Sequence, residues 1–361
     1  MWSDIFLVVV VVLAIVMAGP RFDDAHQPIT LPPASDLTGQ TIVVTGGTSG
    51  VGHQAALELA SRGGRVVLTG RSKGRADTAA AQLTGTGHFG LALDLTSHDS
   101  VLTFAKEVKK LKKVDVLLFN AGMIYGPDFT GPFQTGTYPG GLVDTMIASN
   151  HLGSFALVQE LLSLLESSGT RVVFVSSISH HLGTPALLED TADPVGGVDG
   201  STLGAGQAVR AFGLYGDTKL LNVLTANRLE RECESCSVVV VTPGFCATSM
   251  GSADRTPGIF NPAEYLPLTF SAKQGGDMLV AATQVDSAEV AGGKMMQPYW
   301  IWEDVPLLQG RWKGALFNLV EEMLFQRLVP PGIYVHTQSD AGLDELLQDR
   351  AWDWSMQMVG K

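Results

Sequence analysis

The segment Thr45-Gly46-Gly47-Thr48-Ser49-Gly50-Val51-Gly52 follows a short β-branched run and opens a stretch with helical periodicity. Glycines in such a turn let the backbone bend tightly and approach an anion closely. The helix that begins there offers unpaired N–H groups and the positive end of its dipole. A glycine-rich turn alone is weak evidence in a chain with 41 glycines, but its place between a strand and a helix strengthens it. The segment predicts a turn that binds the pyrophosphate of a dinucleotide, with a plain tight turn as the alternative.

Outward from this turn, short β-branched runs alternate with longer helical stretches. Apolar strands that alternate with helices are typical of a parallel sheet covered on both faces. We therefore expect an α/β fold with a doubly wound parallel sheet, which is a nucleotide-binding architecture. The expected strands are residues 41–45, 65–69, 88–93, 114–119, 171–176 and 237–242, and the expected helices include residues 51–62, 97–111, 143–166 and 215–232.

A second motif, Tyr215-Gly-Asp-Thr-Lys219, places a phenol and an ammonium four residues apart on one face of a helix. The unperturbed pKa of tyrosine, about 10, makes it a poor base at neutral pH. A nearby lysine cation, together with an oxidised nicotinamide, is expected to lower the pKa of Tyr215. The phenol then takes a proton from an alcohol or gives one to a carbonyl. This spacing is close to chance on its own and gains weight only in series with the other motifs.

In their order along the chain, these motifs resemble the short-chain dehydrogenase/reductase family over about residues 40–300. The resemblance implies a single Rossmann domain in which Asn120-Ala121-Gly122 closes the fourth strand beneath a nicotinamide cofactor. It implies that Ser177 polarises the substrate oxygen, with Ser176 as the alternative. It also implies that Asn150 holds a proton-relay water near the lysine, whereas the alternative role of Asn150 is a buried amide that bends its helix.

The resemblance thus assigns catalysis to Ser177, Tyr215, Lys219 and Asn150. It places Asp94 and Leu95 beside the adenine, although a strand-end turn is the alternative role of Asp94. The full set expected to bind the cofactor is Gly46, Thr48, Ser49, Gly50, Val51, Gly52, Arg71, Asp94, Leu95, Asn120, Ala121, Gly122, Tyr215, Lys219, Pro243, Gly244 and Thr248. No metal site is expected.

The end of the second strand, Leu68-Thr69-Gly70-Arg71-Ser72, bears on the choice of cofactor. NAD-specific folds of this kind hold the ribose hydroxyls with an acidic residue at this point. An arginine suits a 2′-phosphate instead, through its charge and the fork of its guanidinium. The sequence therefore favours NADP(H) over NAD(H), with Thr48 and Ser49 as further hydroxyl donors.

Within the family, the segments at residues 150–153, 177–183 and 219–224 resemble the membrane-bound retinol dehydrogenase branch. This implies an NADP(H)-dependent alcohol dehydrogenase or carbonyl reductase for a hydrophobic substrate such as a retinoid, steroid or fatty aldehyde. Residues 215–224 also resemble light-dependent protochlorophyllide reductases, so reduction of a tetrapyrrole C=C bond is one alternative. A catalytically silent NADP(H)-binding structural subunit is another, which loss of the Tyr, Lys or Ser would signal.

An uncharged apolar run, Ile5 to Gly19, stands near the start of the sequence. A helix of this length reaches about 22 Å, which is short for a full bilayer span. A retained membrane anchor is favoured over a cleaved signal peptide, because Asp4 and the lack of Lys or Arg before the run make a poor signal n-region. Arg21 weakly places the following domain in the cytosol, and we expect the endoplasmic reticulum as its membrane.

Composition and cysteines narrow the partners further. A net charge of −12 and the lack of a basic stripe argue against nucleic acid. The expected partners are a small hydrophobic substrate, the membrane through residues 5–19 and, as one option, a second copy of the chain. Cys233-Glu-Ser-Cys236 has no second pair or nearby histidine that would complete a zinc site. The cysteines are therefore interpreted as thiols in a reducing compartment.

Two segments depart from the family pattern. Residues 182–207 are expected to form a lid or pocket wall. Residues 300–338 form an insertion whose amphipathic helix, Gly310 to Leu328, packs on the body or lies at a membrane surface. The expected division of the chain is an anchor at residues 1–20, a linker at 21–39, a Rossmann domain at 40–300 and a C-terminal helical extension at 301–361 that packs on the domain and ends in a helix at 343–359.

Overall fold

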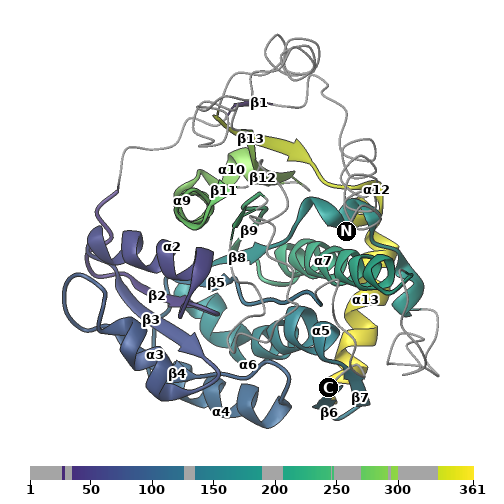
Figure 1. Ribbon diagram of the computed structural model, residues 1–361, viewed down its shortest axis with the longest axis horizontal. Helices are drawn as coiled ribbons and strands as arrows, with labels where there is room; N and C mark the ends of the chain where they lie inside the picture. Colours follow the sequence, from purple (N-terminus) through teal and green to yellow (C-terminus); the bar gives the residue numbers. More distant parts are fainter. Residues whose placement is uncertain are drawn as a thin grey trace.

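The apolar runs of the sequence form one large sheet in the computed structural model (Figure 1). The structure describes residues 27–28, 35–125, 135–188, 206–244, 246–247, 270–291, 294–299 and 332–361. Within these residues the sheet has nine strands, in the order β1 (Gln27–Pro28), β13 (Gly332–Thr337), β12 (Lys294–Tyr299), β9 (Ser237–Val241), β8 (Arg171–Val175), β5 (Val116–Phe119), β2 (Thr41–Val44), β3 (Arg65–Gly70) and β4 (Phe89–Ala92).

The strand order confirms the expected doubly wound fold. The strands from β12 to β4 are parallel, whereas β13 pairs antiparallel with β12 and β1 antiparallel with β13. From β2 the chain passes outward to β3 and β4, then returns to β5 on the other side and continues to β8, β9 and β12. Ligands bind in such sheets beyond the carboxyl ends of the strands, where the order reverses. All six expected strands are present, while β12 and β13 were not among them.

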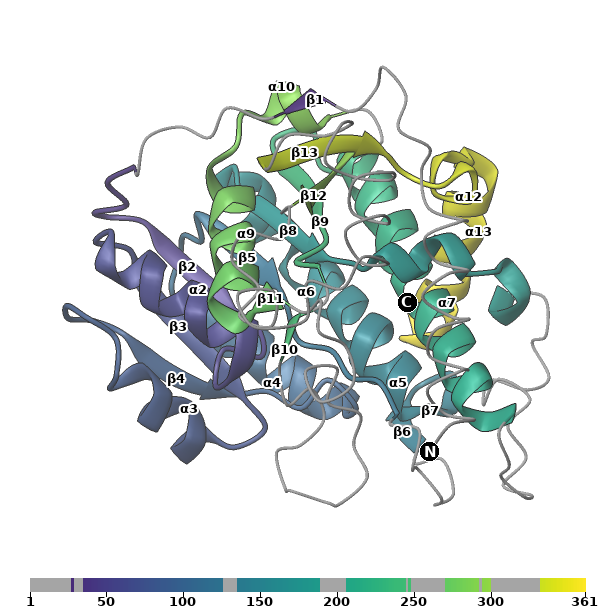
Figure 2. The same ribbon diagram turned by 45° about the horizontal axis from the view of Figure 1, so that its top comes forward.

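Helices cover both faces of the sheet, as Figures 1 and 2 show. In β2, Val43 belongs to one hydrophobic cluster and Ile42 and Val44 belong to the other, because successive side chains of a strand point to opposite faces. The cluster around Val43 includes residues of α4 (His98–Lys109), α6 (Gly153–Ser168) and α7 (Gly206–Glu232). The opposite cluster includes residues of α2 (Gly50–Ser61), α3 (Lys73–Ala80), α9 (Ala272–Gln284) and α10 (Ser287–Val290).

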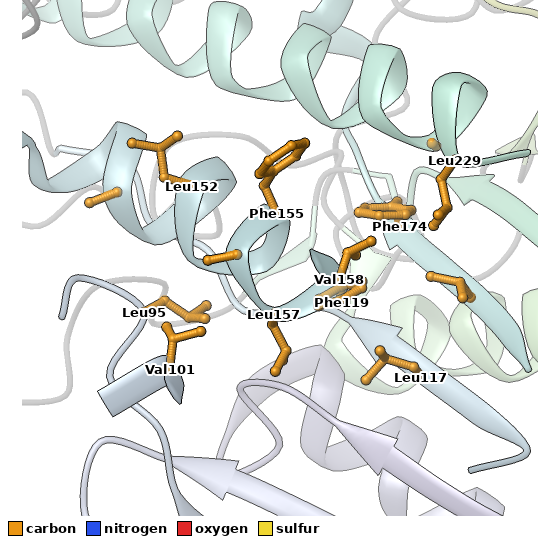
Figure 3. Packing of buried hydrophobic residues seen from close by; sticks show 14 of the residues in the cluster. Leu95, Val101, Leu117, Phe119, Leu152, Phe155, Leu157, Val158, Phe174 and Leu229 are labelled. Carbon is orange, nitrogen blue, oxygen red and sulfur yellow. The ribbon is translucent and has the colours of Figure 1, made fainter. Parts of the chain in front are cut away.

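Leucine, valine and phenylalanine side chains pack around α6, both toward the sheet and on its other side (Figure 3). Phe119 of β5 and Phe174 of β8 stack with their ring centroids 4.9 Å apart. Phe155 of α6 meets Trp352 of α13 (Glu345–Met358) edge-on at 5.0 Å. Such pairs contribute about 1 kcal/mol each beyond the area they bury, so the same core extends from the sheet to the C-terminal helix. This helix confirms the one expected at residues 343–359.

Shorter elements connect these layers. A π-helical turn, η1, stands between α5 and α6, and two 3₁₀ turns, η2 and η3, follow β8. Two small paired sheets, β6–β7 and β10–β11, lie outside the main one. Their bounds are Thr145–Ile147 for α5, Ala148–Leu152 for η1, Ile178–Leu182 for η2, Pro185–Leu188 for η3, Asp340–Leu343 for α12, Thr135–Tyr138 for β6, Gly141–Asp144 for β7, Cys246–Ala247 for β10 and Phe270–Ser271 for β11.

Three expectations fall on residues outside the described part: the anchor at 5–19, most of the lid at 182–207 and the amphipathic helix at 310–328. In the part of the chain that the structure describes, no helix combines the length and the apolar character needed to cross a bilayer.

Cys233 and Cys236, expected as thiols, are joined by a disulfide. The turn after α7 brings their Cα atoms to 5.3 Å, which is within the range that a disulfide bridges. Cys246 is a free cysteine, as expected.

The contact between β4 and α3 yields a stability test. A Cβ atom on Gly90 would lie 2.3 Å from the backbone of both Ala76 and Asp77. Because helix backbone yields little, we expect Gly90→Ala to lower the free energy of unfolding by about 1–3 kcal/mol. Gly74 of the same helix has nothing within 4 Å of such an atom, so Gly74→Ala should raise stability by about 0.5–1 kcal/mol. Chemical denaturation measures both, and an unchanged midpoint for Gly90→Ala would contradict this packing.

Candidate active site

The glycine turn lies between β2 and α2, at the carboxyl edge of the sheet. Gly46 has φ +65° and Gly50 has φ +60°, a region that side chains disfavour. Ser49 is the N-cap residue of α2, yet its side chain accepts no hydrogen bond from the first turn. The first N–H groups of α2 are therefore not capped by Ser49 and suit an anion. The turn fits the pyrophosphate of a dinucleotide.

Hydrogen bonds from Asn120 fasten this turn to the end of β5. Asn120 Nδ2 donates to the carbonyl oxygens of Thr45 at 3.0 Å and Gly46 at 3.2 Å. In return, Thr45 Oγ1 accepts the backbone N–H groups of Asn120 at 3.0 Å and Ala121 at 3.1 Å. A Cβ atom on Gly52 would lie 2.3 Å from Asn120 Nδ2, so α2 starts in contact with the same amide. Asn120 lies beneath the turn, and its contact with a cofactor stays a prediction.

Arg71 follows β3 on the surface and is exposed. It makes no ion pair with any residue that the structure describes. Lys73, two residues later, pairs with Asp77 at 2.7 Å instead. Arg71 lies beside the glycine turn, because a Cβ atom on Gly70 would stand 2.7 Å from Thr48 Cγ2. A phosphate bound beyond this edge of the sheet would lie near the exposed guanidinium of Arg71.

Asp94 has a local role after β4. Its Oδ1 accepts the backbone N–H of Thr96 at 3.0 Å and the Thr96 hydroxyl at 2.7 Å. Its own N–H donates to Ser100 Oγ at 2.9 Å. Asp94 thus organises a strand-end turn, which was the alternative role considered for it. The contact of Asp94 and buried Leu95 with an adenine stays a prediction.

Tyr215 and Lys219 lie one turn apart on α7, which begins nine residues earlier than expected. Both side chains are buried, with 9% of Tyr215 and 3% of Lys219 exposed. Lys219 Nζ stands 5.4 Å from the centre of the Tyr215 ring and donates a hydrogen bond of 3.0 Å to the carbonyl oxygen of Val175. The helix therefore presents both groups to the carboxyl end of β8.

The two serines after β8 have different partners. The Ser176 hydroxyl donates to the backbone carbonyl of Lys219 at 2.9 Å and is buried. The Ser177 side chain hydrogen-bonds the Tyr215 phenol instead, and Ser177 Oγ accepts the N–H of Ser179 at 3.3 Å. Of the two alternatives, Ser177 is the one that the structure brings to the tyrosine.

Asn150 lies within the π-helical turn η1. Its Oδ1 accepts the N–H of Met123 at 2.7 Å, while its Nδ2 donates to Met123 O at 2.8 Å and to Thr218 Oγ1 at 3.1 Å. A Cβ atom on Gly122 would stand 3.3 Å from Asn150 Oδ1 and 3.5 Å from Lys219 Nζ. Gly122 therefore leaves open a space that both side chains reach. The helix irregularity and the nearness to lysine agree with both roles weighed for Asn150, and the relay stays a prediction.

Burial decides the protonation of the tyrosine and lysine. It raises the pKa of Tyr215 to about 12; the hydrogen bond from Ser177 lowers this pKa, and the nearby Cys246 group raises it. Burial also lowers the pKa of Lys219 to about 8. In the cofactor-free protein, desolvation of the phenolate thus dominates the pKa of Tyr215. Tyr215 is a neutral phenol at neutral pH. The lowered pKa was expected for lysine and an oxidised nicotinamide together, and for that complex it stays a prediction.

Pro243 and Gly244 follow β9 at the same edge, and Gly244 has φ +80°. Cys246 Sγ donates to the Pro243 carbonyl at 3.3 Å, and burial raises the pKa of Cys246 to about 12. The thiol is therefore protonated and a poor nucleophile. Thr248 lies outside the described residues.

Sequence reasoning missed the residues that hold these groups in place. Thr45, Met123 and Thr218 each bond a predicted site residue, but only their nearness to a motif in the sequence hinted at it. His151 and His180 gave even less signal, because each bonds a serine that lies more than a hundred residues away.

Comparison with known proteins agrees with this geometry. Residues 40–188 match the family model described as short chain dehydrogenase. Dehydrogenase/reductase SDR family member 13 of Bos taurus is 36% identical over 222 residues, which cover 59% of this chain and 53% of that protein. Retinol dehydrogenase 14 of Mus musculus is 32% identical over 244 residues, covering 63% and 67%. The chain belongs to the short-chain dehydrogenase/reductase family.

Members of this family bind nicotinamide cofactors, and the glycine turn described above suits one. The chain spans between about half and two thirds of the length of the curated relatives it matches first. The crystal structure of an uncharacterized protein from Mycobacterium Paratuberculosis shares the fold, with a TM-score of 0.63 at 24% identity over 92% of this chain and 98% of the other.

The contact between Gly52 and Asn120 gives a test of the cofactor half of this site. We expect Gly52→Ala to displace the Asn120 amide and weaken NADPH binding about tenfold, since a bound phosphate requires close backbone approach. Titration of NADPH by its fluorescence measures the dissociation constant. Gly74→Ala, which adds a methyl group to open space, serves as control. Equal affinity in the two variants would count against a cofactor at this turn.

Proposed function

We propose that this protein is an NADP(H)-dependent oxidoreductase that interconverts an alcohol and a carbonyl on a hydrophobic substrate. The observation that carries the proposal is the grouping of Tyr215, Lys219, Ser177 and Asn150 at one edge of the sheet, beside the glycine turn. A catalytically silent relative would have no need to keep all of these groups together. The family's chemistry and the names of the relatives agree with this activity.

The chemistry follows from the protonation states. Bound NADP(H) supplies or accepts the hydride at the substrate carbon. In reduction, the Ser177 hydroxyl donates a hydrogen bond to the carbonyl oxygen, and Tyr215 gives its proton to that oxygen as the carbon is reduced. The neutral phenol at pH 7 is the form that this step needs. Lys219 then stabilises the phenolate, and a proton returns to Tyr215 through the space beside Gly122 that Lys219 and Asn150 reach.

Arg71 supports NADP(H) as the cofactor. Its guanidinium, which pairs with no acid among the described residues, follows the end of β3. A 2′-phosphate lies at this point when the pyrophosphate occupies the start of α2. The guanidinium of an arginine is weakly hydrated, so binding a phosphate costs it little hydration free energy. Its planar fork also donates two hydrogen bonds to two phosphate oxygens at once.

Apolar alcohols and carbonyls are the proposed substrates, and retinoids stand first among them. This choice rests first on relatives named retinol dehydrogenase 13 and 14. It rests also on the apolar run at residues 5–19, from which we predict an anchor in the membrane of the endoplasmic reticulum. Reduction of a tetrapyrrole C=C bond and a silent binding role remain the alternatives. Turnover of retinal, steroid ketones or long-chain aldehydes, with NADPH consumption as the signal, separates the proposal from both alternatives. A C=C reductase is distinguished from a silent protein by its product or by a light requirement.

The proton donor is tested by Tyr215→Phe, which removes one oxygen atom. We expect kcat to fall by about 10³-fold or more, since general acid catalysis is lost, while the dissociation constant for NADPH stays within about twofold, because the phenol is not the main cofactor contact. Tyr138→Phe removes another buried phenol, one that donates to Leu95 O, and should keep most of the activity. Turnover by Tyr215→Phe at the wild-type rate would refute the mechanism.

The cofactor preference is tested by Arg71→Asp. Reversing this charge should repel the 2′-phosphate and instead favour ribose hydroxyls, so that the ratio of kcat/KM for NADPH to that for NADH falls by about 100-fold or more. Arg75→Asp makes the same change of charge four residues later on exposed α3 and should alter this ratio far less. A wild-type protein that uses both cofactors equally would overturn the assignment of Arg71.

A further inference from the structure

Two buried histidines connect the candidate catalytic residues to the C-terminal segment, which we define as residues 338–361. His151 stands next to Asn150 in η1, and His180 stands three residues after Ser177 in η2. Each has only 1% of its surface exposed. Each also bonds a serine of the C-terminal segment, from the far side of the site.

The hydrogen bonds of His180 fix its tautomer. The backbone N–H of Ser339 donates to His180 Nε2 at 3.3 Å, and an N–H group can only donate. Nε2 is therefore the acceptor, and the proton lies on Nδ1, which donates to the carbonyl oxygen of Ser177 at 2.7 Å. Through one imidazole, the start of α12 holds the backbone of the residue that contacts Tyr215.

His151 makes the corresponding link to Asn150. The Ser355 hydroxyl donates to the carbonyl of Ala351 at 2.7 Å, so its oxygen accepts the His151 Nε2–H at 2.7 Å. Burial lowers the pKa of His151 to about 3. The ring is thus neutral at working pH. Trp354 stacks on it with centroids 6.2 Å apart, which fixes its plane between η1 and α13.

The C-terminal segment is itself fastened to α7, the helix of Tyr215 and Lys219. Asn227 and Gln338 exchange side-chain hydrogen bonds of 2.6 and 3.2 Å, and Asn227 also donates to Gly342 O at 2.7 Å. Farther along, Arg231 pairs with Asp349 at 2.8 Å. In Figures 1 and 2, α12 and α13 lie along α7. The C-terminal segment thus contacts α7, η1 and η2, which carry or adjoin the candidate catalytic side chains.

We propose that the C-terminal segment sets the positions of Ser177 and Asn150 relative to Tyr215, with His180 and His151 as the positioning residues that transmit this support. The inference rests on the proposed function, since it concerns the same site. Neither imidazole reaches the reacting groups: His180 acts on the Ser177 backbone, and His151 acts on the helical turn that carries Asn150.

A shift of Ser177 would change the pKa of Tyr215. If the C-terminal segment only stabilised the fold, this pKa would stay unchanged when the segment is altered. Around the Tyr215 phenol stand Ser177 after β8, Cys246 of β10 and Lys219 of α7. Of these groups, Ser177 lowers the pKa of Tyr215 by its hydrogen bond. If Ser177 shifts, the phenol becomes a weaker acid, and alcohol oxidation, which needs the phenolate, requires a higher pH.

The first test uses Ser339→Pro. Ser339 has φ −60°, which proline adopts without strain, and proline removes the N–H that His180 Nε2 accepts. Ser339→Ala is the matched control, because both variants lose the hydroxyl that caps α12 through Gly342 but alanine keeps the N–H. We expect Ser339→Pro to lower kcat about tenfold and to move the pH profile of alcohol oxidation to higher pH, with KM for the cofactor unchanged. Ser339→Ala should keep the wild-type profile.

The second test uses α13. Ser355→Ala deletes the acceptor of His151, whereas Leu347→Ala loosens the packing of α13 on α7 without touching a histidine. Positioning predicts that Ser355→Ala loses more kcat although Leu347→Ala loses more thermal stability. Should Ser339→Pro fail to fold, this comparison decides the matter by itself. Loss of kcat in proportion to loss of melting temperature across both variants would overturn the proposal, as would identical pH profiles for Ser339→Pro and Ser339→Ala.

Different results would contradict the proposed function and the positioning role of the C-terminal segment. If the wild-type protein shows no NADPH-dependent turnover on any member of the substrate panel, the proposed function fails. The tautomer of His180, read by nitrogen NMR of labelled histidine, then still tests the contact between His180 and Ser339. We expect a proton on Nδ1 in the wild type and in Ser339→Ala, and a changed histidine signal in Ser339→Pro. If turnover is present and depends on Tyr215 but Ser339→Pro behaves as Ser339→Ala does, only the positioning inference fails.

Discussion

The hydrogen bond from the Lys219 ammonium to the carbonyl oxygen of Val175 is the constraint on which the site depends. A cation withdrawn from water is costly unless it is bonded, and burial already lowers the pKa of Lys219 to about 8. The end of β8 provides the acceptor at 3.0 Å, and the Ser176 hydroxyl returns a bond to the Lys219 carbonyl at 2.9 Å. These two bonds fix the register of α7 against β8. The next residue, Ser177, places its side chain at Tyr215, one turn before Lys219 on α7.

A second set of bonds carries this register to the cofactor half of the site. Asn150 ties the Met123 backbone, just after β5, to Thr218 of α7. Three residues before Met123, Asn120 bonds the first residues of the glycine turn. The Ser177 hydroxyl, the Tyr215 phenol and the glycine turn are thus parts of one framework that stands on three neighbouring parallel strands. Such a framework aligns the reacting groups before any ligand binds, which is how pre-organisation lowers a barrier.

The sequence predicted the fold from its simplest features. Six strands were readable because each is a short run of mostly apolar residues between turns, such as the four valines at residues 238–241, and the central strands are buried on both faces. The glycine turn was readable because its φ values exclude most side chains. β12 was not, because Lys294, Gln297 and Pro298 interrupt its apolar residues. The helix bend at Asn150 was considered from the residue itself, but the partners of its carboxamide, Met123 and Thr218, lie on other parts of the chain and were not readable.

Within the site, residue identities were predictable and their energetics were not. Tyr215, Lys219 and Ser177 come together as the order of the motifs implied, yet the sequence did not indicate that burial raises the pKa of Tyr215 in the cofactor-free protein. A pKa depends on the balance between burial and nearby charge, and the extent of burial is known only once α7 lies against β8. Asp94 illustrates the same limit. From the sequence, an acidic residue at a strand end can equally be assigned to its own turn or to a bound ligand, and only the structure shows the bond to Thr96.

The contacts of the C-terminal segment show why the last part of a chain matters to a site built from its middle. His151 and Ser355 are 204 residues apart, and His180 and Ser339 are 159 apart, so no local pattern announces either pair. Imidazole suits these links because a neutral ring donates at one nitrogen and accepts at the other, whereas a lysine or carboxylate in the same place would bring an uncompensated charge into the core. With a pKa of about 3, His151 keeps its proton count above roughly pH 4. Its hydrogen bond to Ser355, which supports the turn of Asn150, therefore stays the same over the pH range in which Tyr215 and Lys219 change their protonation.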